Sequence, residues 1–382
     1  MSNLSTYIKE FGDISFQDMS FGDGDNIAMC YMYYMPFEKV VSSDFDDEPV
    51  PFSVAANNLF AQRGYKHKAV GLILPKNISV QMMEMAKRKR YAQMKVVACT
   101  EIFEKEPAVQ FNAATFLLPN GDIVILFRGT DDTFTGWKED VDIITRESIP
   151  SNNLATQYLE KAAEKFDGDI IICGHSKGGY VAQYGALNCK KEVRDRIKWL
   201  YNNDGPGFQD YSFLDTDAYK ELLPRYKHFV PQSSFIGMLL YHDDDYKIVK
   251  SNRVLGALQH DLATWQFQGD TLKTVNELTP QGKVNDLVMY NLVNNMTREQ
   301  TKAFDDVLST VINGNDNVGL LDIPANVIPT IKNSKTAVEG IEDDTIKCFQ
   351  SAFSDLGNHL VNSVRTVRSG EFTSVKDRKK NQ

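Results

Sequence analysis

The sequence predicts an α/β protein in which helices wrap a mostly parallel sheet. The first observation is that strand-like and helix-like segments alternate from about residue 96 to residue 250. Such alternation is typical of parallel sheets, because each crossover between parallel strands has room for a helix. The second observation is that two strand-like segments, 123–127 and 170–173, are continuously apolar. Strands that are covered on both faces have this pattern.

The composition favours a large buried core and disfavours nucleic acid as a ligand. Of the 382 residues, 42% are hydrophobic and 11% are aromatic, whereas disordered chains are poor in both. The 51 acidic residues outnumber the 42 basic ones, which gives a net charge of −9. Binding to nucleic acid phosphates needs a basic surface, which this balance does not favour.

The sequence predicts neither a membrane span, nor a signal peptide, nor a disulfide framework. No apolar run reaches the length of about 18 residues that a membrane span needs. The first residues lack a basic region followed by an apolar one. The five cysteines are scattered without a CxxC pair, which suits reduced thiols and disfavours a zinc site. We therefore expect a cytoplasmic protein.

Three regions are predicted along the chain. Residues 1–90 are expected to form a helical, loop-rich extension, 91–270 the α/β core, and 271–382 a helical region that packs on this core. In the first region, the acidic loop Asp44–Pro51 is expected to be solvated, because it lacks the ligand spacing and the turn glycine of a cation site.

A β-hairpin is predicted around Asn120–Gly121. Two apolar segments, 113–119 and 122–127, flank this pair. An Asn-Gly pair is typical of type I′ turns, in which both central residues have positive φ. After the hairpin, helices are expected at about 154–166 and 178–187, and further strands at 169–173, 197–202, 226–230 and 246–249.

Beyond about Gly269 the strand patterns stop, and two amphipathic helices are expected. Thr297 and Gln300 form a capping box, and the helix that it opens is expected to end at Asn313–Gly314. The last helix carries apolar residues at helical spacing over 346–364. We interpret both apolar faces as packing surfaces; the alternative is that one of them lies on a membrane surface.

The clearest chemical signal is the pentapeptide Gly174-His175-Ser176-Lys177-Gly178 between a predicted strand and a predicted helix. A serine on such a sharp turn has a strained backbone, and side chains two residues before and after it would clash, so glycine occupies both positions. The turn exposes the serine hydroxyl to the N–H groups of the next helix, which stabilise negative charge. Ser176 is therefore the candidate nucleophile; the alternative is a tight turn that contains a serine.

Two backbone N–H groups are predicted to bind an oxyanion. One belongs to Lys177, the residue after the nucleophile, and the other to Thr130, which follows an earlier strand in Arg128-Gly129-Thr130. Sites with this type of turn take their second donor from such a loop. The Thr130 hydroxyl is expected to be able to add a hydrogen bond. The alternative for residues 128–130 is an ordinary turn at the end of a strand.

The base is expected to be a histidine downstream of the serine. His260 follows the last strand pattern of the core, where the loop that delivers the base belongs. Among the other candidates, His228 falls inside a predicted strand, His242 in an acidic loop that we expect to be solvated, and His359 in the last helix. His175 is expected to point away from the site.

The acid that orients this histidine is expected to be Asp204. It follows a predicted strand and precedes Gly205-Pro206-Gly207, which places it at the carboxyl edge of the sheet, where catalytic groups gather. The alternatives are the cluster Asp243, Asp244 and Asp245 after a later strand, or a role for Asp204 as a turn carboxylate only.

These motifs resemble those of class 3 lipases, which belong to the α/β-hydrolase superfamily. The resemblance rests on Phe127–Thr130, on Trp137 and Asp140, and on Gly174–Gly179. The stretches Asn202–Phe208 and Gln259–Trp265 look closer to a bacterial lipase-like branch. The resemblance covers about residues 96–269. It implies a Ser-Asp-His triad, an oxyanion hole near Thr130 and a lid over about 131–153.

The sequence departs from the class 3 pattern at two positions. Class 3 lipases usually carry the acid just before a Val-Pro pair, but His228 and Phe229 precede Val230–Pro231 here. Lys177 stands where leucine is usual. A charge beside the nucleophile is expected to alter the acyl pocket, which argues against long-chain triglycerides as substrates.

We therefore expect a serine hydrolase that cleaves carboxylic esters, lipid esters included, through Ser176, His260 and Asp204. No cofactor or metal ion is expected, since the acidic clusters lack ligand spacing. The expected partners are the acyl ester substrate and, transiently, a lipid surface. The alternative is a non-catalytic or regulatory protein of the same fold that binds a partner through its helical ends. The missing carboxylate before Val230 favours this alternative.

Overall fold

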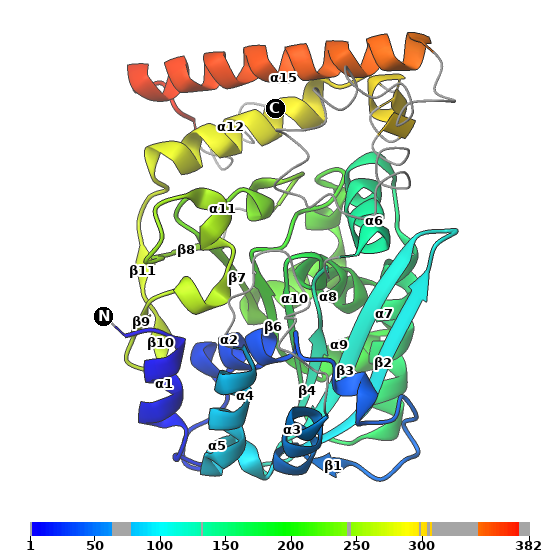
Figure 1. Cartoon of the computed structure of the whole chain (residues 1–382), viewed down its shortest axis with the longest axis vertical. Coiled ribbons are helices and arrows are strands. Elements are labelled where there is room, and N and C mark those ends of the chain that lie inside the picture. Colours follow the sequence, from blue (N-terminus) through cyan, green and yellow to red (C-terminus); the bar gives the residue numbers. More distant parts are fainter. Residues whose placement is uncertain are drawn as a thin grey trace.

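The computed structural model describes residues 2–62, 78–130, 133–242, 246–297, 299–303, 306–307 and 343–373. In this part of the chain the main element is a nine-stranded sheet in the order β1-β2-β3-β4-β5-β6-β7-β8-β11 (Figure 1). Strands β4 to β8 are parallel, and the strands on either side of them pair antiparallel. The strands are β1 (Val50–Pro51), β2 (Lys95–Glu104), β3 (Val109–Leu117), β4 (Ile123–Phe127), β5 (Ile170–His175), β6 (Ile197–Asn203), β7 (Tyr226–Pro231), β8 (Lys247–Val249) and β11 (Thr274–Val275).

Helices lie on both faces of this sheet, so the predicted α/β fold is confirmed. Their bounds are α1 (Leu4–Phe11), α2 (Asp23–Met32), α3 (Phe52–Ala61), α4 (Ile78–Lys87), α5 (Lys89–Ala92), α6 (Phe134–Thr145), α7 (Pro150–Lys165), α8 (Lys177–Asn188), α9 (Lys191–Asp195), α10 (Asp217–Leu222), α11 (Gly256–Gln259), α12 (Pro280–Asn295) and α15 (Asp343–Ser369).

The strand order decides which helices cover which face. Strands β4 to β8 lie in the sheet in the order in which they follow in the chain. Because crossovers between parallel strands are right-handed, all of them then pass over the same face. Residues of α7, α8 and α10, such as Leu159, Val181 and Leu222, accordingly pack in one hydrophobic cluster with Ile125 and Ile172 of the strands.

The opposite face of the sheet is covered by the N-terminal helices α1 to α5 (Figure 1). Residues on this face of the strands, among them Leu126 and Ile171, share a second cluster with Tyr7 of α1 and Met29 of α2. Alternate residues of β4 and β5 therefore enter different clusters, as the pleat of a doubly covered strand requires. The N-terminal helices thus form most of one of the two layers that bury the sheet.

The hairpin at Asn120–Gly121 is confirmed, but its turn is not of type I′. Strands β3 and β4 pair up to Leu117 and Ile123. The turn is closed by a bond from the Gly121 N–H to the Leu118 carbonyl, and Gly121 has positive φ while Asn120 does not. Pro119 stands at the second turn position, where its fixed negative φ disfavours a primed turn, and the negative φ of Asn120 at the third position leaves type I rather than type II.

Against expectation, two short strands lie beyond Gly269. Short strands lie at β9 (Phe267–Gln268), β10 (Thr271–Leu272) and β11, and β11 closes the edge of the main sheet against β8. Two-residue strands are too short to show a period in the sequence, and long-range pairing alone defines them.

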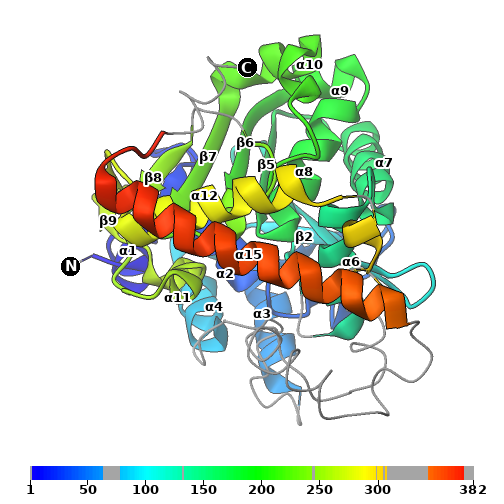
Figure 2. The same ribbon diagram turned by 90° about the horizontal axis from the view of Figure 1, so that it is seen from above.

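Helices α12 and α15 lie side by side across the carboxyl end of the parallel strands (Figure 2). The amide of Asn285 on α12 donates to the carbonyls of Ser233 and Ser234, which follow β7. The predicted capping box is confirmed by bonds in both directions between Thr297 and Gln300. The predicted helix end at 313–314 lies outside the described residues.

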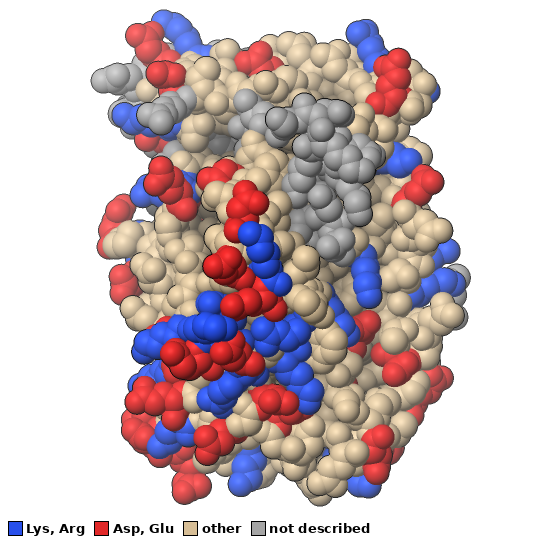
Figure 3. Space-filling view, turned by 180° about the vertical axis from the view of Figure 1, so that it is seen from behind, with Lys and Arg blue, Asp and Glu red and all other residues tan. Residues whose placement is uncertain are grey.

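Three properties of the described residues bear on what the protein could bind: surface charge, metal-binding clusters and membrane-spanning helices. Basic and acidic side chains alternate on the face seen in Figure 3, so this face has no continuous basic surface. Among the described residues, no cluster of three or more His, Cys, Asp or Glu side chains is placed to hold a metal ion. No helix in this part of the chain has the length and hydrophobicity to cross a membrane.

Candidate active site

Ser176 stands on a strained turn between β5 and α8. Its φ of 58° and ψ of −133° lie in a region that side chains rarely adopt. The glycines of the pentapeptide have the predicted steric reason: a Cβ on Gly174 would lie 2.0 Å from the Gly178 carbonyl oxygen, and one on Gly178 would lie 2.2 Å from that of Phe127. The turn is held by the Ser176 N–H, which donates to the Asn203 carbonyl at 3.0 Å.

Asp204 and His260 are hydrogen-bonded to each other. Nδ1 of His260 lies 2.7 Å from Oδ2 of Asp204. Asp204 directly follows β6, the neighbour of β5, and His260 directly follows α11. Because His175 of β5 pairs with Asn203 of β6, the residues Ser176 and Asp204 leave the same edge of the sheet at the same level.

The carboxylate of Asp204 is held from its other oxygen as well. Oδ1 accepts the hydroxyl of Ser234 and the backbone N–H of Gly237, the latter at 3.1 Å. Asp204 has a φ of 53°, and its side chain is 1% exposed. Ser234 and Gly237 follow Val230–Pro231 of β7, where class 3 lipases usually carry their acid. Here this segment instead provides donors to the carboxylate that follows the neighbouring strand β6.

Thr130 follows β4 and bonds to helix α6. Its hydroxyl donates to Oδ1 of Asp140 at 2.7 Å, so that proton is directed at a carboxylate rather than at an oxyanion. Burial raises the pKa of Asp140 from its ordinary 3.8 to about 6, although Lys177 and the Thr130 bond lower it. The backbone N–H of Lys177 begins α8 and has no acceptor within the helix.

The ammonium group of Lys177 lies in a buried network. Nζ donates to the backbone carbonyl of Gln110 at 2.7 Å, to its side-chain oxygen at 2.8 Å and to Glu139 Oε2 at 2.7 Å. The side chains of Lys177 and Glu139 are 2% and 0% exposed. The charge is therefore paired inside the core and joins the serine turn to α6, in the region predicted as a lid.

The expectation that His175 points away from the site is wrong: it ends β5 at the sheet edge that the histidine loop covers, and its ring centroid lies 4.4 Å from that of His260. Two further histidines are buried on β7 and after it. His228 is buried on β7, as expected, with its ring beside those of Tyr226 and His242. The expectation that His242 is solvated is wrong, since it is buried against Tyr246. Packing of the loop on β7 excludes water there, which its acidic sequence does not reveal. The alternative acids 243–245 lie outside the described residues.

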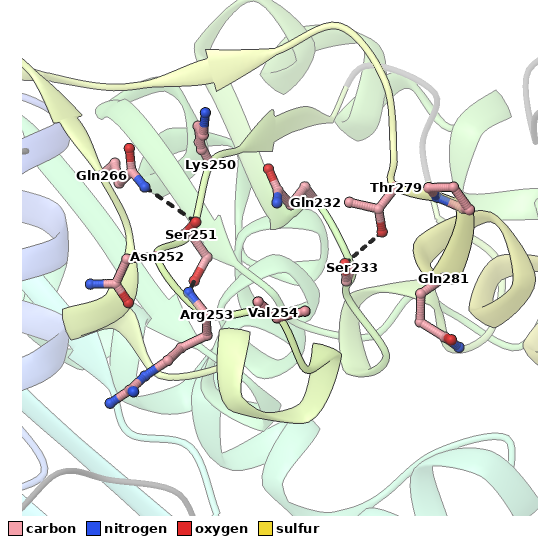
Figure 4. Close-up of a pocket in the computed structure, with 11 residues that line it drawn as sticks. Gln232, Ser233, Lys250, Ser251, Asn252, Arg253, Val254, Gln266, Thr279 and Gln281 are labelled. Carbon is pink, nitrogen blue, oxygen red and sulfur yellow. Dashed lines mark hydrogen bonds between the residues drawn. The ribbon is translucent and has the colours of Figure 1, made fainter.

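A pocket of about 430 Å³ lies behind the histidine loop (Figure 4). Residues that follow β7 and β8 and that begin α12 line it, and Ser176, Asp204 and His260 are not among them. Two of its hydroxyl groups, those of Ser233 and Thr279, bond to each other at 2.6 Å. The Ser233 N–H also donates to Gln259, beside His260, so the pocket wall supports the histidine loop.

The fold and the serine turn define an α/β protein of the lipase-like class. The Mbeg1-like family matches residues 85–310, which is more than half of the chain. The protein therefore belongs to the Mbeg1-like family, whose members are lipase-like and related to class 3 lipases. Comparisons with curated proteins and with solved structures found no match.

Proposed function

We propose that this protein is a serine hydrolase that cleaves carboxylic esters through an acyl-enzyme. The observation that carries the proposal is the 2.7 Å bond between Asp204 and His260 at the sheet edge where Ser176 stands on its strained turn. This bond removes the main argument for a non-catalytic protein, because an acid is available although none precedes Val230. Membership of a lipase-like family supports the same reaction class.

Each residue has a role in this proposal. Ser176 attacks the ester carbonyl, and His260 takes its proton and returns it to the leaving alcohol. Asp204 keeps the proton of His260 on Nδ1, which leaves Nε2 free to act as the base. The N–H groups of Thr130 and Lys177 stabilise the oxyanion. Water then hydrolyses the acyl-enzyme by the same proton path in reverse.

Exposed apolar side chains around the histidine loop support an ester with an apolar acyl group. Val254 and Leu255, in the loop that leads to His260, are 87% and 67% exposed, and Leu258 is also exposed. Phe235, between the two donors to Asp204, is exposed as well. Because the ammonium group of Lys177 is paired with Glu139, Lys177 places no unpaired charge beside the nucleophile. We therefore favour lipid-like esters, and a place in the bacterial lipase-like branch.

A fluorophosphonate probe tests the proposal, because it labels only an activated serine. We expect labelling of the wild type, none in Ser176→Ala, and a reduction of about 100-fold or more in His260→Ala. Ser212→Ala, which removes an exposed serine, is the matched control and should label normally. If neither a short-chain nor a long-chain probe labels the folded wild type, the proposal is wrong and a binding protein of this fold takes its place.

A panel of esters with increasing acyl length tests the preference for apolar acyl groups. We expect the double variant Val254→Ser, Leu255→Ser to raise KM for long acyl chains by about tenfold, since about 1–2 kcal/mol of apolar contact is lost. Acetyl esters should be unaffected. An equal effect on all chain lengths would contradict the assignment of these side chains to the substrate.

A further inference from the structure

A second histidine, His175, lies directly beside His260 and has no role in the mechanism above. The ring centroids of the two histidines are 4.4 Å apart, and the ring planes differ by 32°. Nε2 of His175 lies 2.9 Å from the backbone carbonyl oxygen of His260. His175 is the last residue of β5 and is buried, so it contacts His260 from the rigid part of the molecule.

The other ring nitrogen of His175 is bonded to Tyr34 from the N-terminal region. The Tyr34 hydroxyl lies 2.7 Å from Nδ1 of His175 and is fully buried behind the serine turn. The same hydroxyl lies against Gly129, beside Thr130. A Cβ on Gly129 would lie 2.4 Å from it, so only glycine allows this approach. Tyr34 thus contacts both the oxyanion turn and the histidine pair.

These contacts define one tautomer of His175. The carbonyl oxygen of His260 can only accept a hydrogen bond, so Nε2 of His175, which lies 2.9 Å from it, must carry the ring proton. In the neutral ring Nδ1 is then an acceptor, to which the Tyr34 hydroxyl donates. Burial lowers the pKa of His175 well below its ordinary value, and a positive charge on His260 lowers it further. His175 therefore stays neutral when His260 is protonated.

The histidine loop is short and partly exposed, so contacts with the rest of the molecule fix its position. His260 ends α11, which has only four residues, and the loop before it carries the exposed Val254 and Leu255. On the other side, Gln259 bonds to Ser233 and accepts the indole N–H of Trp265 at its carbonyl. The bond and the ring contact from His175 join this loop to the strand that carries the nucleophile.

We propose that Tyr34 and His175 are positioning residues that hold His260 for proton transfer with Ser176, with Tyr34 acting through His175. This inference rests on the proposed function. Tyr34 stabilises this tautomer of His175 by donating to Nδ1, and His175 contacts both the backbone and the ring of His260. Without the Tyr34 hydroxyl, the ring proton of His175 is free to move to Nδ1, and two acceptors, Nε2 and the His260 carbonyl, then face each other.

The rate constant for fluorophosphonate labelling of Ser176 tests this proposal without knowledge of the natural substrate. We expect Tyr34→Phe to lower it by about tenfold, the equivalent of one hydrogen bond. His175→Phe keeps a ring but loses the donor, and we expect a loss of about 100-fold, as for a misplaced base. Tyr34→Phe should cause no further loss in the His175→Phe background, because its effect passes through His175.

The matched control is Tyr33→Phe. The Tyr33 hydroxyl is also buried and has no hydrogen-bond partner among the described residues. Its removal should leave the labelling rate unchanged, which separates positioning from the loss of any buried hydroxyl. His175→Gln keeps a donor and an acceptor on one side chain, and it should label about tenfold faster than His175→Phe if the bonds rather than the bulk matter. Circular dichroism checks that each variant is folded.

The failures of the two proposals are distinguishable. If the wild type is not labelled, the serine hydrolase proposal fails. If the wild type is labelled and folded Tyr34→Phe and His175→Phe are labelled at the same rate, only the positioning role is wrong. If Tyr34→Phe is slow and stays equally costly in the His175→Phe background, Tyr34 acts through Gly129 instead, and the coupling to His175 is overturned.

Discussion

The N-terminal and C-terminal helices are both predicted as additions to the α/β core, but they join it in different ways. In α2 every residue from Gly24 to Met32 is buried. In α15, by contrast, Leu360 and Val361 are 46% and 51% exposed. The strand order explains the difference, because crossovers that all pass over one face leave the other face to be covered by another part of the chain.

Polar contacts show the same contrast between the two ends. In the N-terminal region Asp25 and Arg90 form a fully buried ion pair, and Asn26 exchanges amide bonds with Asn203, beside the candidate acid. The C-terminal helices reach the site mainly through Asn285, which bonds to the backbone after β7. A region that looks peripheral in the sequence is thus part of the core when the sheet has no other cover on that face.

The largest effect is expected at the buried ion pair of the N-terminal layer. Nε and Nη2 of Arg90 bond to Asp25 at 2.7 and 2.6 Å, and Nη1 binds three backbone carbonyls of the loop before α2. Arg90→Met leaves a buried carboxylate unpaired, and we expect the free energy of unfolding to fall by about 3–5 kcal/mol. Arg88→Met, at a partly exposed ion pair two residues earlier, should cost about 1 kcal/mol or less. Equal effects in urea denaturation would mean that the N-terminal layer is not part of the cooperative core.

A smaller effect is expected where the serine turn meets α6. Lys177→Leu restores the residue usual in class 3 lipases but leaves Glu139 buried with only the Gln110 N–H and Ser151 as donors. We expect a loss of about 2–4 kcal/mol of unfolding free energy. Adding Glu139→Gln should recover most of it, because no buried charge then remains. If the double variant is no more stable than Lys177→Leu, the ion pair is not what joins the turn to α6.

The buried carboxyl group of Asp140 on α6 is expected to make the stability of the protein depend on pH. Its pKa is about 6 in the folded protein and near 3.8 in the unfolded chain. The unfolded chain therefore loses this proton first, and the stability that the group contributes at low pH is lost as pH rises from about 4 to about 6. Asp140→Asn has no such loss, so from pH 4 to pH 7 we expect it to gain about 1–3 kcal/mol on the wild type. A stability difference that is constant over this range, measured by urea unfolding, would contradict the raised pKa.

The smallest effects are expected in α15. Val364 packs against the cluster that includes Val230 and Met289, and Val364→Ser should lower the free energy of unfolding by about 1–2 kcal/mol. Val361→Ser, three residues earlier on the exposed side, should change it by no more than about 0.5 kcal/mol. Thermal melting compares the two. A large cost at Val361 would mean that α15 is covered by another surface in solution.

Most elements with a local pattern are predictable from this sequence. The parallel strands, the hairpin and the capping box follow from apolar runs, turn residues and side-chain spacing within a few positions. The serine turn is predictable for the same reason, because Gly174 and Gly178 relieve clashes inside one tight turn. The order of the strands is not predictable in this way. The role of the N-terminal helices in covering the sheet depends on that order and is therefore not predictable either.

The sequence by itself determined the α/β class, the serine turn and the candidates Asp204 and His260, since each depends on short-range backbone sterics or on the end of a strand. The sequence favoured Asp204 as the partner of His260, and the tertiary structure brings the two together. Only the tertiary structure decided the pairs Lys177 with Glu139 and Tyr34 with His175, 141 residues away. The physical reason is that a buried polar group bonds to whatever the fold brings within about 3 Å of it. Sequence separation has no bearing on that distance.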